Sequence, residues 1–464
     1  MRQSDPEAPS PRTGLLSQTA GLMVTRRFAP LFWSQFFSAF NDNLVRNMLA
    51  MIILFRVGET DAGPLVTLAV AAFVLPSIVL SGLGGQLADG HDKAAVARGL
   101  KIAELFIQAL AAIGFWMVSI PVLYLALFGL GAIATLYSPV KYGILPDHLR
   151  RDELTLANAL VEGAAFVAVL LGLAAGGLTG LEGTSTWSVL AQLAGVSLAC
   201  VTATWFIPPS GVAAPGLRID RNLFGSTFGL LGILRSDRRL WIGALGGAWF
   251  WLSGAITLSL VPLVVKQRIG GGVEVETAIS VFFAIGVGLG ATLAGWLAHG
   301  RIFIKHVPYA TVFMGVFLVD TGLATHGLGL ADGGLALGDF LRSGVGLRVA
   351  VDLIGLACAG GLFSVPLFAA VQSWAPKDCR ARVVAACGVM NALLMVAGSS
   401  LTALLQSSLV RVPDPILLIG LGVANLAAAL YFQRVLPDAD ARPTPSDTAL
   451  LRPVSAKAEA GPMP

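Results

Sequence analysis

Five polar residues fall within a stretch of seven near the N-terminus, inside an otherwise apolar segment. They are Asn41, Asp42, Asn43, Arg46 and Asn47. Ionisable groups in a spanning segment are costly, so they form a functional hypothesis by default. Asp42 and Arg46 are four residues apart, on one face of a helix, where they could neutralise each other. Two interpretations stand: a structural ion pair that fixes this helix, or a cavity wall that meets a charged or zwitterionic ligand.

Further polar side chains are spaced to extend such a cavity. Lys141 and Tyr142 lie near the end of one apolar segment, and Asn158 and Glu162 lie one helical turn apart on the next. The second half of the chain instead offers an apolar wall with Phe282, Phe283, Phe363 and Phe368. A cavity that is polar on one side and apolar on the other suits an amphipathic substrate. The predicted substrate-binding residues are Asn41, Asp42, Asn43, Arg46, Lys141, Tyr142, Asn158 and Glu162.

A second group of residues predicts a gate. The string Gly85-Gln-Leu-Ala-Asp89-Gly-His-Asp-Lys93 resembles the cytoplasmic loop signature of the major facilitator superfamily. In that family the Asp pairs with groups at a neighbouring helix end and latches the outward-facing state. A carboxylate is stabilised by a helix N-terminus or by an Arg, and Arg380 and Arg382 are candidate partners. We predict a gating latch formed by Gly85, Asp89, Lys93, Arg380 and Arg382. The alternative is that the Gly85–Lys93 string is a solvated turn.

Several enzymatic motifs are missing. The chain contains no Gly-Lys pair, so it has no P-loop for ATP. His148 and Asp152 are separated by three residues, whereas the acyltransferase signature needs four. Five histidines without an HExxH arrangement predict no metal site, and four cysteines without CxxC spacing predict no disulfide framework. We expect no enzyme activity and no cofactor.

The elements that position these residues follow from composition. Of 464 residues, 55% are hydrophobic and 12% charged, where a soluble domain carries about 25% charged residues. The formal net charge of +4 is explained by basic cytoplasmic loops rather than by nucleic-acid binding. Lipid is therefore the expected solvent, and the chain is predicted to be an all-α membrane protein.

Twelve apolar stretches are long enough to cross a bilayer, which takes about 20 residues. They lie at 28–55, 64–88, 95–118, 121–143, 154–180, 187–207, 240–265, 276–298, 305–325, 349–372, 383–408 and 415–434. Basic residues gather in alternate connections and place both termini in the cytoplasm. The first stretch is too long for a signal peptide and should be retained.

The predicted organisation has five parts. These are a cytoplasmic tail at 1–27, a six-helix bundle at 28–207, a central loop at 208–239, a second bundle at 240–436 and a disordered tail at 437–464. Within the loop, Leu223–Leu234 is too short to span and is expected to lie along the interface.

Short strings recur in the same order in both halves. Asn158-Ala-Leu matches Asn391-Ala-Leu, and Gly85-Gln-Leu-Ala matches Gly295-Trp-Leu-Ala, although His299 replaces the Asp of the latch. Parallel repeats around a midplane cavity are typical of transporters, so we predict two pseudo-symmetric six-helix bundles in the major facilitator fold.

Three segments resemble the lysophospholipid transporter family, some members of which are fused to glycerophospholipid acyltransferases. The segments are Phe28-Ala-Pro-Leu-Phe-Trp-Ser-Gln-Phe-Phe-Ser-Ala-Phe-Asn-Asp-Asn-Leu44, Ser138-Pro-Val-Lys-Tyr-Gly-Ile-Leu-Pro146 and Asn158-Ala-Leu-Val-Glu-Gly163. Arg46 and Ser138 stand where relatives often have Lys and Gly. No acyltransferase domain follows the twelfth stretch, so the resemblance implies a stand-alone transporter.

The resemblance implies that lysophospholipids such as lysophosphatidylethanolamine are flipped across a bacterial inner membrane toward the cytoplasmic leaflet. A separate acyltransferase would then reacylate them. Asn41, Asp42, Asn43, Lys141 and Glu162 would contact or gate the polar head, and alternating access would move the lipid. We expect a monomer in the bilayer. The alternatives are a proton-coupled exporter of drugs or other amphiphiles, with Asp42 or Glu162 titrating, and a non-transporting scaffold for a lipid acyltransferase.

Overall fold

The protein is described by a computed structural model. It covers residues 15–56, 59–178, 186–220, 222–298, 301–329, 331, 334–406 and 409–436. The predicted segment ends at Gly180 and Ser408, the residue His299 and the tail at 437–464 lie outside these ranges.

Helices make up both halves of the chain. In the first half the long helices are α2 (Ala29–Arg56), α3 (Glu59–Gly90), α4 (Lys93–Trp116), α5 (Ile120–His148), α6 (Leu154–Leu178) and α7 (Thr186–Trp205). In the second they are α9 (Arg238–Val264), α10 (Val273–Ala298), α11 (Val307–His326), α13 (Gly344–Trp374), α14 (Arg380–Gln406) and α15 (Asp414–Val435). Each of the twelve predicted stretches overlaps one of these helices. The predicted all-α membrane fold is confirmed.

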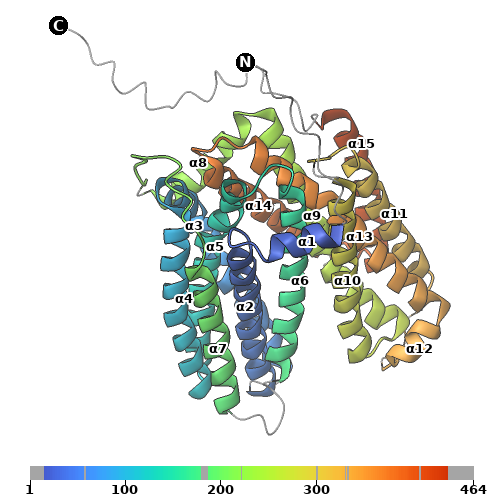
Figure 1. Cartoon of the computed structure of the whole chain (residues 1–464). Coiled ribbons are helices and arrows are strands. Elements are labelled where there is room, and N and C mark those ends of the chain that lie inside the picture. The colour runs from blue at the N-terminus through green and yellow to red at the C-terminus, as the bar shows by residue number, and fades with distance from the viewer. Residues whose placement is uncertain are drawn as a thin grey trace.

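Ten of the described helices are long and apolar enough to cross a membrane. The other two long helices, α2 and α4, each carry several buried polar side chains, among them Asn41 and Asn43 on α2 and Lys101 and Glu104 on α4. The shorter elements are α1 (Leu15–Met23), α8 (Leu223–Arg235), the π-helical turn η1 (Val265–Ile269) and α12 (Leu337–Arg342). Helix α1 falls inside the segment predicted as a tail and lies crosswise to α2 (Figure 1).

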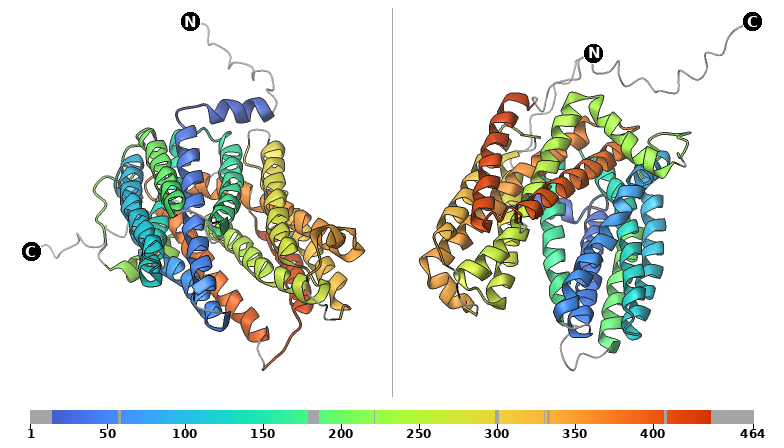
Figure 2. Two further views of the ribbon diagram at one scale, coloured as in Figure 1. Left: turned by 90° about the horizontal axis from the view of Figure 1, so that it is seen from below. Right: turned by 180° about the vertical axis from the view of Figure 1, so that it is seen from behind.

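The two halves repeat the same packing. In the first, α2 packs on α6, α3 on α5 and α4 on α7; in the second, α9 packs on α14, α10 on α13 and α11 on α15. The halves stand side by side and are joined by reciprocal contacts, α3 with α14 and α6 with α10 (Figures 1 and 2). In each half the first long helix packs on the fifth, the second on the fourth and the third on the sixth. This is the pseudo-symmetry that the repeated strings predict.

Small residues bring helix backbones close together within each bundle. A Cβ atom on Gly290 of α10 would lie 2.0 Å from the carbonyl oxygen of Cys358 on α13. A Cβ atom on Gly176 of α6 would lie 2.7 Å from the carbonyl oxygen of Leu44 on α2. Glycine therefore sets the spacing of these helix pairs, as small residues commonly do between helices in lipid.

Helix α13 starts at Gly344, five residues before the predicted start at Val349. The hydroxyl oxygen of Ser343 accepts a hydrogen bond from the backbone N–H of Gly346 at 3.0 Å, which caps the helix. The charged Arg348 lies in the second turn and lowers the local hydropathy. The apolar scan therefore placed the boundary too late.

Helix α8 follows the central connection and contacts both halves, through α3 and α14. Its Thr227 hydroxyl donates to the carbonyl oxygen of Val79 at 3.1 Å and accepts from the N–H of Gly82 at 3.0 Å. A Cβ atom on Gly82 would lie 2.5 Å from the Ser226 hydroxyl. Helix α8 is thus fixed against α3 across the end of the bundle at which α3 terminates.

Candidate functional site

A cavity of about 300 Å³ lies between the two halves. Helices α5 and α6 of the first half and α9, α13 and α14 of the second half line it. The lining residues are Ser138, Lys141, Tyr142, Glu162, Ala165, Gly243, Ala244, Gly247, Trp251, Phe368, Val371, Gln372, Val384, Cys387, Gly388 and Asn391. Its volume is at the lower end of the range for small-molecule sites.

The charged wall of the cavity belongs to the first half. The Tyr142 hydroxyl donates a hydrogen bond to Oε1 of Glu162 at 2.5 Å. The Lys141 ammonium lies 4.4 Å from the centre of the Tyr142 ring, a cation–π contact. The structure therefore brings together three of the residues proposed from the sequence, with one cationic and one anionic side chain on the same wall.

The opposite wall is mainly apolar. Phe368 lies against Tyr142, with ring centroids 6.3 Å apart, and Val371 and Val384 also line the cavity from this half. Of the four phenylalanines proposed for this wall, Phe368 lines the cavity and the other three do not. Phe363 is fully buried between Phe250 and Phe432, Phe283 packs against Phe166, and Phe282 packs at the edge of the core.

The polar cluster of α2 lies elsewhere, since none of its members lines this cavity. Asn41 donates to the Ser197 hydroxyl at 3.2 Å, and Asn43 donates to the Ala39 carbonyl oxygen at 2.7 Å. The Arg46 guanidinium lies 4.3 Å from the centre of the Phe73 ring. Among the described side chains no ion pair joins Asp42 to Arg46. Their role in binding stays a prediction, while the observed contacts pack α2 against its neighbours.

A buried ion pair lies beside that cluster. Lys101 and Glu104 of α4 are 2.5 Å apart and almost fully buried. The Lys101 ammonium also donates to the Ser38 hydroxyl at 2.6 Å and lies 4.1 Å from the centre of the Tyr137 ring. Lys101 and Glu104 are three residues apart on one helix face, whereas Tyr137 comes from α5, so its contact with Lys101 joins distant segments of the chain.

Asn158 has a structural contact that the sequence did not indicate. Its amide exchanges hydrogen bonds with Gln372 of the other half: Asn158 Nδ2 to Gln372 Oε1 at 3.0 Å, and Gln372 Nε2 to Asn158 Oδ1 at 2.9 Å. Both residues are buried. The pair joins α6 to α13 at the edge of the cavity.

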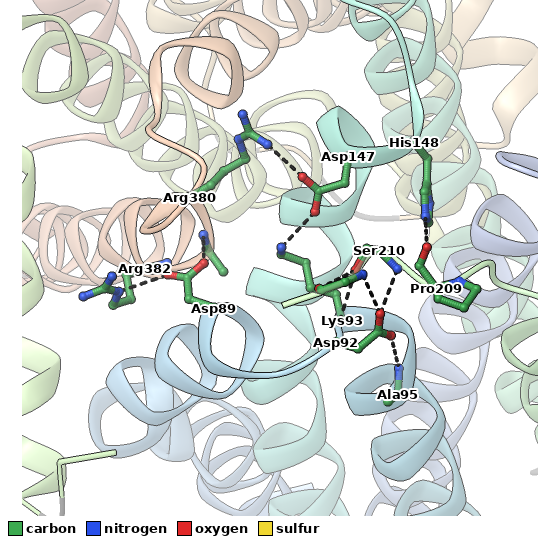
Figure 3. A network of polar contacts seen from close by, with 12 residues as sticks. Asp89, Asp92, Lys93, Ala95, Asp147, His148, Pro209, Ser210, Arg380 and Arg382 are labelled. Atoms are coloured by element: carbon green, nitrogen blue, oxygen red, sulfur yellow. Dashed lines mark hydrogen bonds and ion pairs between the residues drawn. The ribbon is translucent and has the colours of Figure 1, made fainter. Parts of the chain in front are cut away.

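The proposed latch residues meet at one end of the bundle, beyond the cavity. The Asp89 carboxylate accepts hydrogen bonds from the backbone N–H groups of Ala381 and Arg382, at 2.9 and 3.0 Å, and from Nε of Arg382 at 3.0 Å (Figure 3). The Asp89 side chain is fully buried, so it does not sit in a solvent-exposed turn. A Cβ atom on Gly85 would lie 2.9 Å from Cα of Arg382, so glycine allows α3 to approach α14.

Asp147 is a member of this network that sequence reasoning missed. Its carboxylate lies between Lys93 Nζ at 2.8 Å and Arg380 at 2.9 Å, and so connects α5 to both α4 and α14 (Figure 3). Lys93 and Asp147 are almost completely buried, with side chains 1% and 3% exposed. The recurring Pro-Asp and Pro-Lys strings at 146–147 and 376–377 were the available signal.

The latch residues lie close to one end of the cavity. Lys141 precedes Asp147 by six residues on α5, about 9 Å along a helix axis. The cavity-lining residues of α13 and α14 likewise lie close to the ends of those helices at Trp374 and Arg380. Among the described residues, no cluster of three or more His, Cys, Asp or Glu side chains could hold a metal ion.

Both a family model and curated relatives match most of this chain. A family model described as the Major Facilitator Superfamily matches residues 31–398. Lysophospholipid transporters LplT from Yersinia pestis (strain Pestoides F) and Yersinia pseudotuberculosis (serotype O:3, strain YPIII) are each 29% identical over 409 residues. The alignment covers 86% of this chain and 90% of each relative.

Solved structures with the same fold are more distant in sequence. The human organic anion transporter MFSD10 superposes with a TM-score of 0.67 at 14% identity, covering 87% of this chain and 99% of that one. A bacterial homologue of the iron transporter ferroportin, in an outward-facing state, gives 0.65 at 15% identity, covering 86% and 96%. At such identities the likeness concerns the fold.

Proposed function

Because the chain belongs to the Major Facilitator Superfamily, a family of multi-pass membrane transporters, we propose that it carries lysophospholipids across a bacterial inner membrane. The observation that carries the proposal is the division of the cavity wall. Lys141 and Glu162 present opposite charges from the first half, and Phe368 presents an apolar face from the second. The relatives named lysophospholipid transporters support the same substrate.

The charges suit a zwitterionic head group. An ammonium group attracts a phosphate, and a carboxylate attracts a primary amine, so Lys141 and Glu162 together match phosphoethanolamine. The cavity of about 300 Å³ would hold the head and glycerol, while the acyl chain would follow the apolar wall toward lipid. Asp42 and its neighbours on α2 would act on the head group in another conformation, because in this one they lie outside the cavity.

The transport cycle would use the latch. The distribution of basic residues in the connections predicts that the latched end and both termini face the cytoplasm. In the present conformation Asp89 and Asp147 join α3 and α5 to α14, and in this proposal these contacts would close access from the cytoplasm. Rocking of the halves would break these contacts and open the cavity to the cytoplasmic leaflet, where a separate acyltransferase would take the lipid.

The proposal is tested with purified protein in proteoliposomes. Radiolabelled lysophosphatidylethanolamine is added outside, and the fraction protected from extraction by albumin is followed over time. Wild type should raise the rate of protection above that of empty liposomes, and Lys141→Met should lose most of the increase. Diacyl phosphatidylethanolamine serves as the substrate control.

Three outcomes would contradict the proposal. If wild-type and empty liposomes protect the lipid at one rate, the chain does not move lysophospholipids. If a pH gradient instead drives efflux of a cationic dye that Glu162→Gln abolishes, the protein is a proton-coupled exporter. If the purified protein binds an acyltransferase but moves no lipid, the chain is a non-transporting scaffold for that enzyme.

A further inference from the structure

Asn391 of α14 offers the cavity an unused hydrogen-bonding group. Its Oδ1 atom is buried and has no hydrogen-bond partner among the described residues. Asn391 lines the cavity from the apolar half, where a Cβ atom on Gly247 would lie 3.9 Å from its Oδ1 and 3.3 Å from the Phe368 ring. Buried polar atoms are nearly always hydrogen-bonded, so an acceptor left open in a cavity calls for a donor from a ligand.

The repeat of the fold supplies an internal comparison. Asn158 occupies the matching Asn-Ala-Leu string of the first half, and its amide is fully used: it donates to Leu154 and exchanges two hydrogen bonds with Gln372. Asn391 occupies the same string in the second half, yet its Oδ1 atom accepts no hydrogen bond from the described residues. One copy therefore joins the halves, while the other faces the cavity.

The position of Asn391 indicates which part of a ligand it meets. The charged groups that suit phosphate and amine come from α5 and α6, across the cavity. Val384, Cys387 and Phe368 line the cavity from the same half as Asn391, and this apolar lining suits the region where the polar head gives way to the acyl chain. In a monoacyl glycerophospholipid this region carries a free hydroxyl on the glycerol, and in a diacyl lipid the hydroxyl is replaced by an ester.

We propose that Asn391 accepts a hydrogen bond from the free glycerol hydroxyl of a monoacyl lipid and thereby selects monoacyl over diacyl lipids. The inference rests on the proposed function. It adds the residue that distinguishes a free glycerol hydroxyl from an esterified one. A site built to bond a hydroxyl rejects ligands that lack it, because the buried partner is then left unpaired. A second acyl chain would also have to fit where Phe368 and Val384 close the wall.

The test compares two lipids that differ in this hydroxyl alone. Lysophosphatidylethanolamine and its 2-deoxy analogue, with the same head and chain, are supplied to wild type, Asn391→Leu and Asn391→Ser in proteoliposomes. Wild type should favour the hydroxyl lipid about tenfold in kcat/KM, the size of one lost neutral hydrogen bond. Asn391→Leu should move the two lipids at nearly equal rates, and Asn391→Ser should keep part of the preference.

A matched control lies on the same helix outside the cavity. Gln406 donates to Asp414 at 2.7 Å, and Gln406→Leu should keep the wild-type preference. Where a variant reaches the membrane but transports poorly, the increase in melting temperature on adding each lipid reports the same preference without transport.

The outcomes separate this inference from the proposed function. If wild type moves both lipids equally, or if Asn391→Leu keeps the full preference, Asn391 does not read the hydroxyl, although lysophospholipid transport stands. If wild type moves neither lipid, both the proposed function and this inference are wrong.

Discussion

Asn158 and Gln372 exchange two amide hydrogen bonds, at 3.0 and 2.9 Å, across the boundary between the two halves. Both amides are buried, and one belongs to α6 while the other belongs to α13. Rocking of the halves would separate these helices and leave both amides without partners. The pair therefore stabilises the present arrangement of the two halves.

Replacing one member of this pair should cost more than replacing both. Asn158→Leu or Gln372→Leu leaves a buried amide unpaired, at about 1–3 kcal/mol, whereas the double variant leaves none. We expect the double variant to melt at a higher temperature than the sum of the single effects predicts, measured by thermal unfolding in detergent. Additive effects, with no coupling between the residues, would show that the hydrogen bonds do not stabilise this conformation.

The buried charge at Asp147 gives a second prediction. Lys93 and Asp147 are buried together, so Asp147→Ala leaves an unpaired ammonium, at a cost of about 3–5 kcal/mol. The double variant Lys93→Met/Asp147→Leu should recover much of the lost stability. Arg342→Gln is the control, because its pair with Asp339 spans 3.6 Å on the surface and should not change the melting temperature. Equal losses for Asp147→Ala and for the control would contradict the buried-pair interpretation.

Cys379 reports on the latch through its thiol chemistry. It lies in the turn between α13 and α14, and burial raises its pKa to about 12. Maleimides react with the thiolate, so labelling should rise about tenfold for each pH unit between 7 and 10. In Asp89→Ala the latch should open, and the thiol pKa should fall toward its ordinary value of about 8.5. Labelling at pH 8 should then be at least about 100-fold faster and should level off above the lowered pKa.

This experiment needs a background in which the other three cysteines, Cys200, Cys358 and Cys387, are replaced by serine. The matched control is Asp152→Asn, since Asp152 pairs with Arg150 at the exposed surface and has no contact with Asp89. If Asp89→Ala labels at the wild-type rate at every pH, Asp89 does not hold this end closed.

The two basic residues proposed for binding should behave differently. Lys141 lines the cavity, whereas Arg46 stacks on Phe73 outside it. We expect Lys141→Met to raise KM for lysophosphatidylethanolamine at least about tenfold, the value of a charge-assisted hydrogen bond, with little change in melting temperature. Arg46→Met should lower the melting temperature and change KM less. The opposite pattern would move the binding site to α2.

The sequence predicted the twelve long helices well because a run of about 20 mostly apolar residues is visible without knowledge of how the helices pack. It also predicted Asp89 with Arg382, since a loop signature and basic residues at a helix start are local features. It could not predict that Asn158 contacts Gln372, or that Asp147 joins Lys93 to Arg380, because these contacts depend on how distant helices pack. For the same reason, Asn41 and Lys141 were placed in one site, although in this conformation only Lys141 lines the cavity.

Close helix packing gives the last prediction, at Gly290 in the second half. A methyl group there would lie 2.0 Å from the Cys358 carbonyl oxygen, so Gly290→Ala must push α10 away from α13. Because the obstacle is backbone rather than a flexible side chain, we expect a large loss of stability and little folded protein in the membrane. Gly288→Ala on the same helix meets nothing within 4 Å and should be neutral or slightly stabilising. Fluorescence-detected size-exclusion chromatography of both variants checks this, and equal yields of folded protein would mean that α10 and α13 are not in close contact.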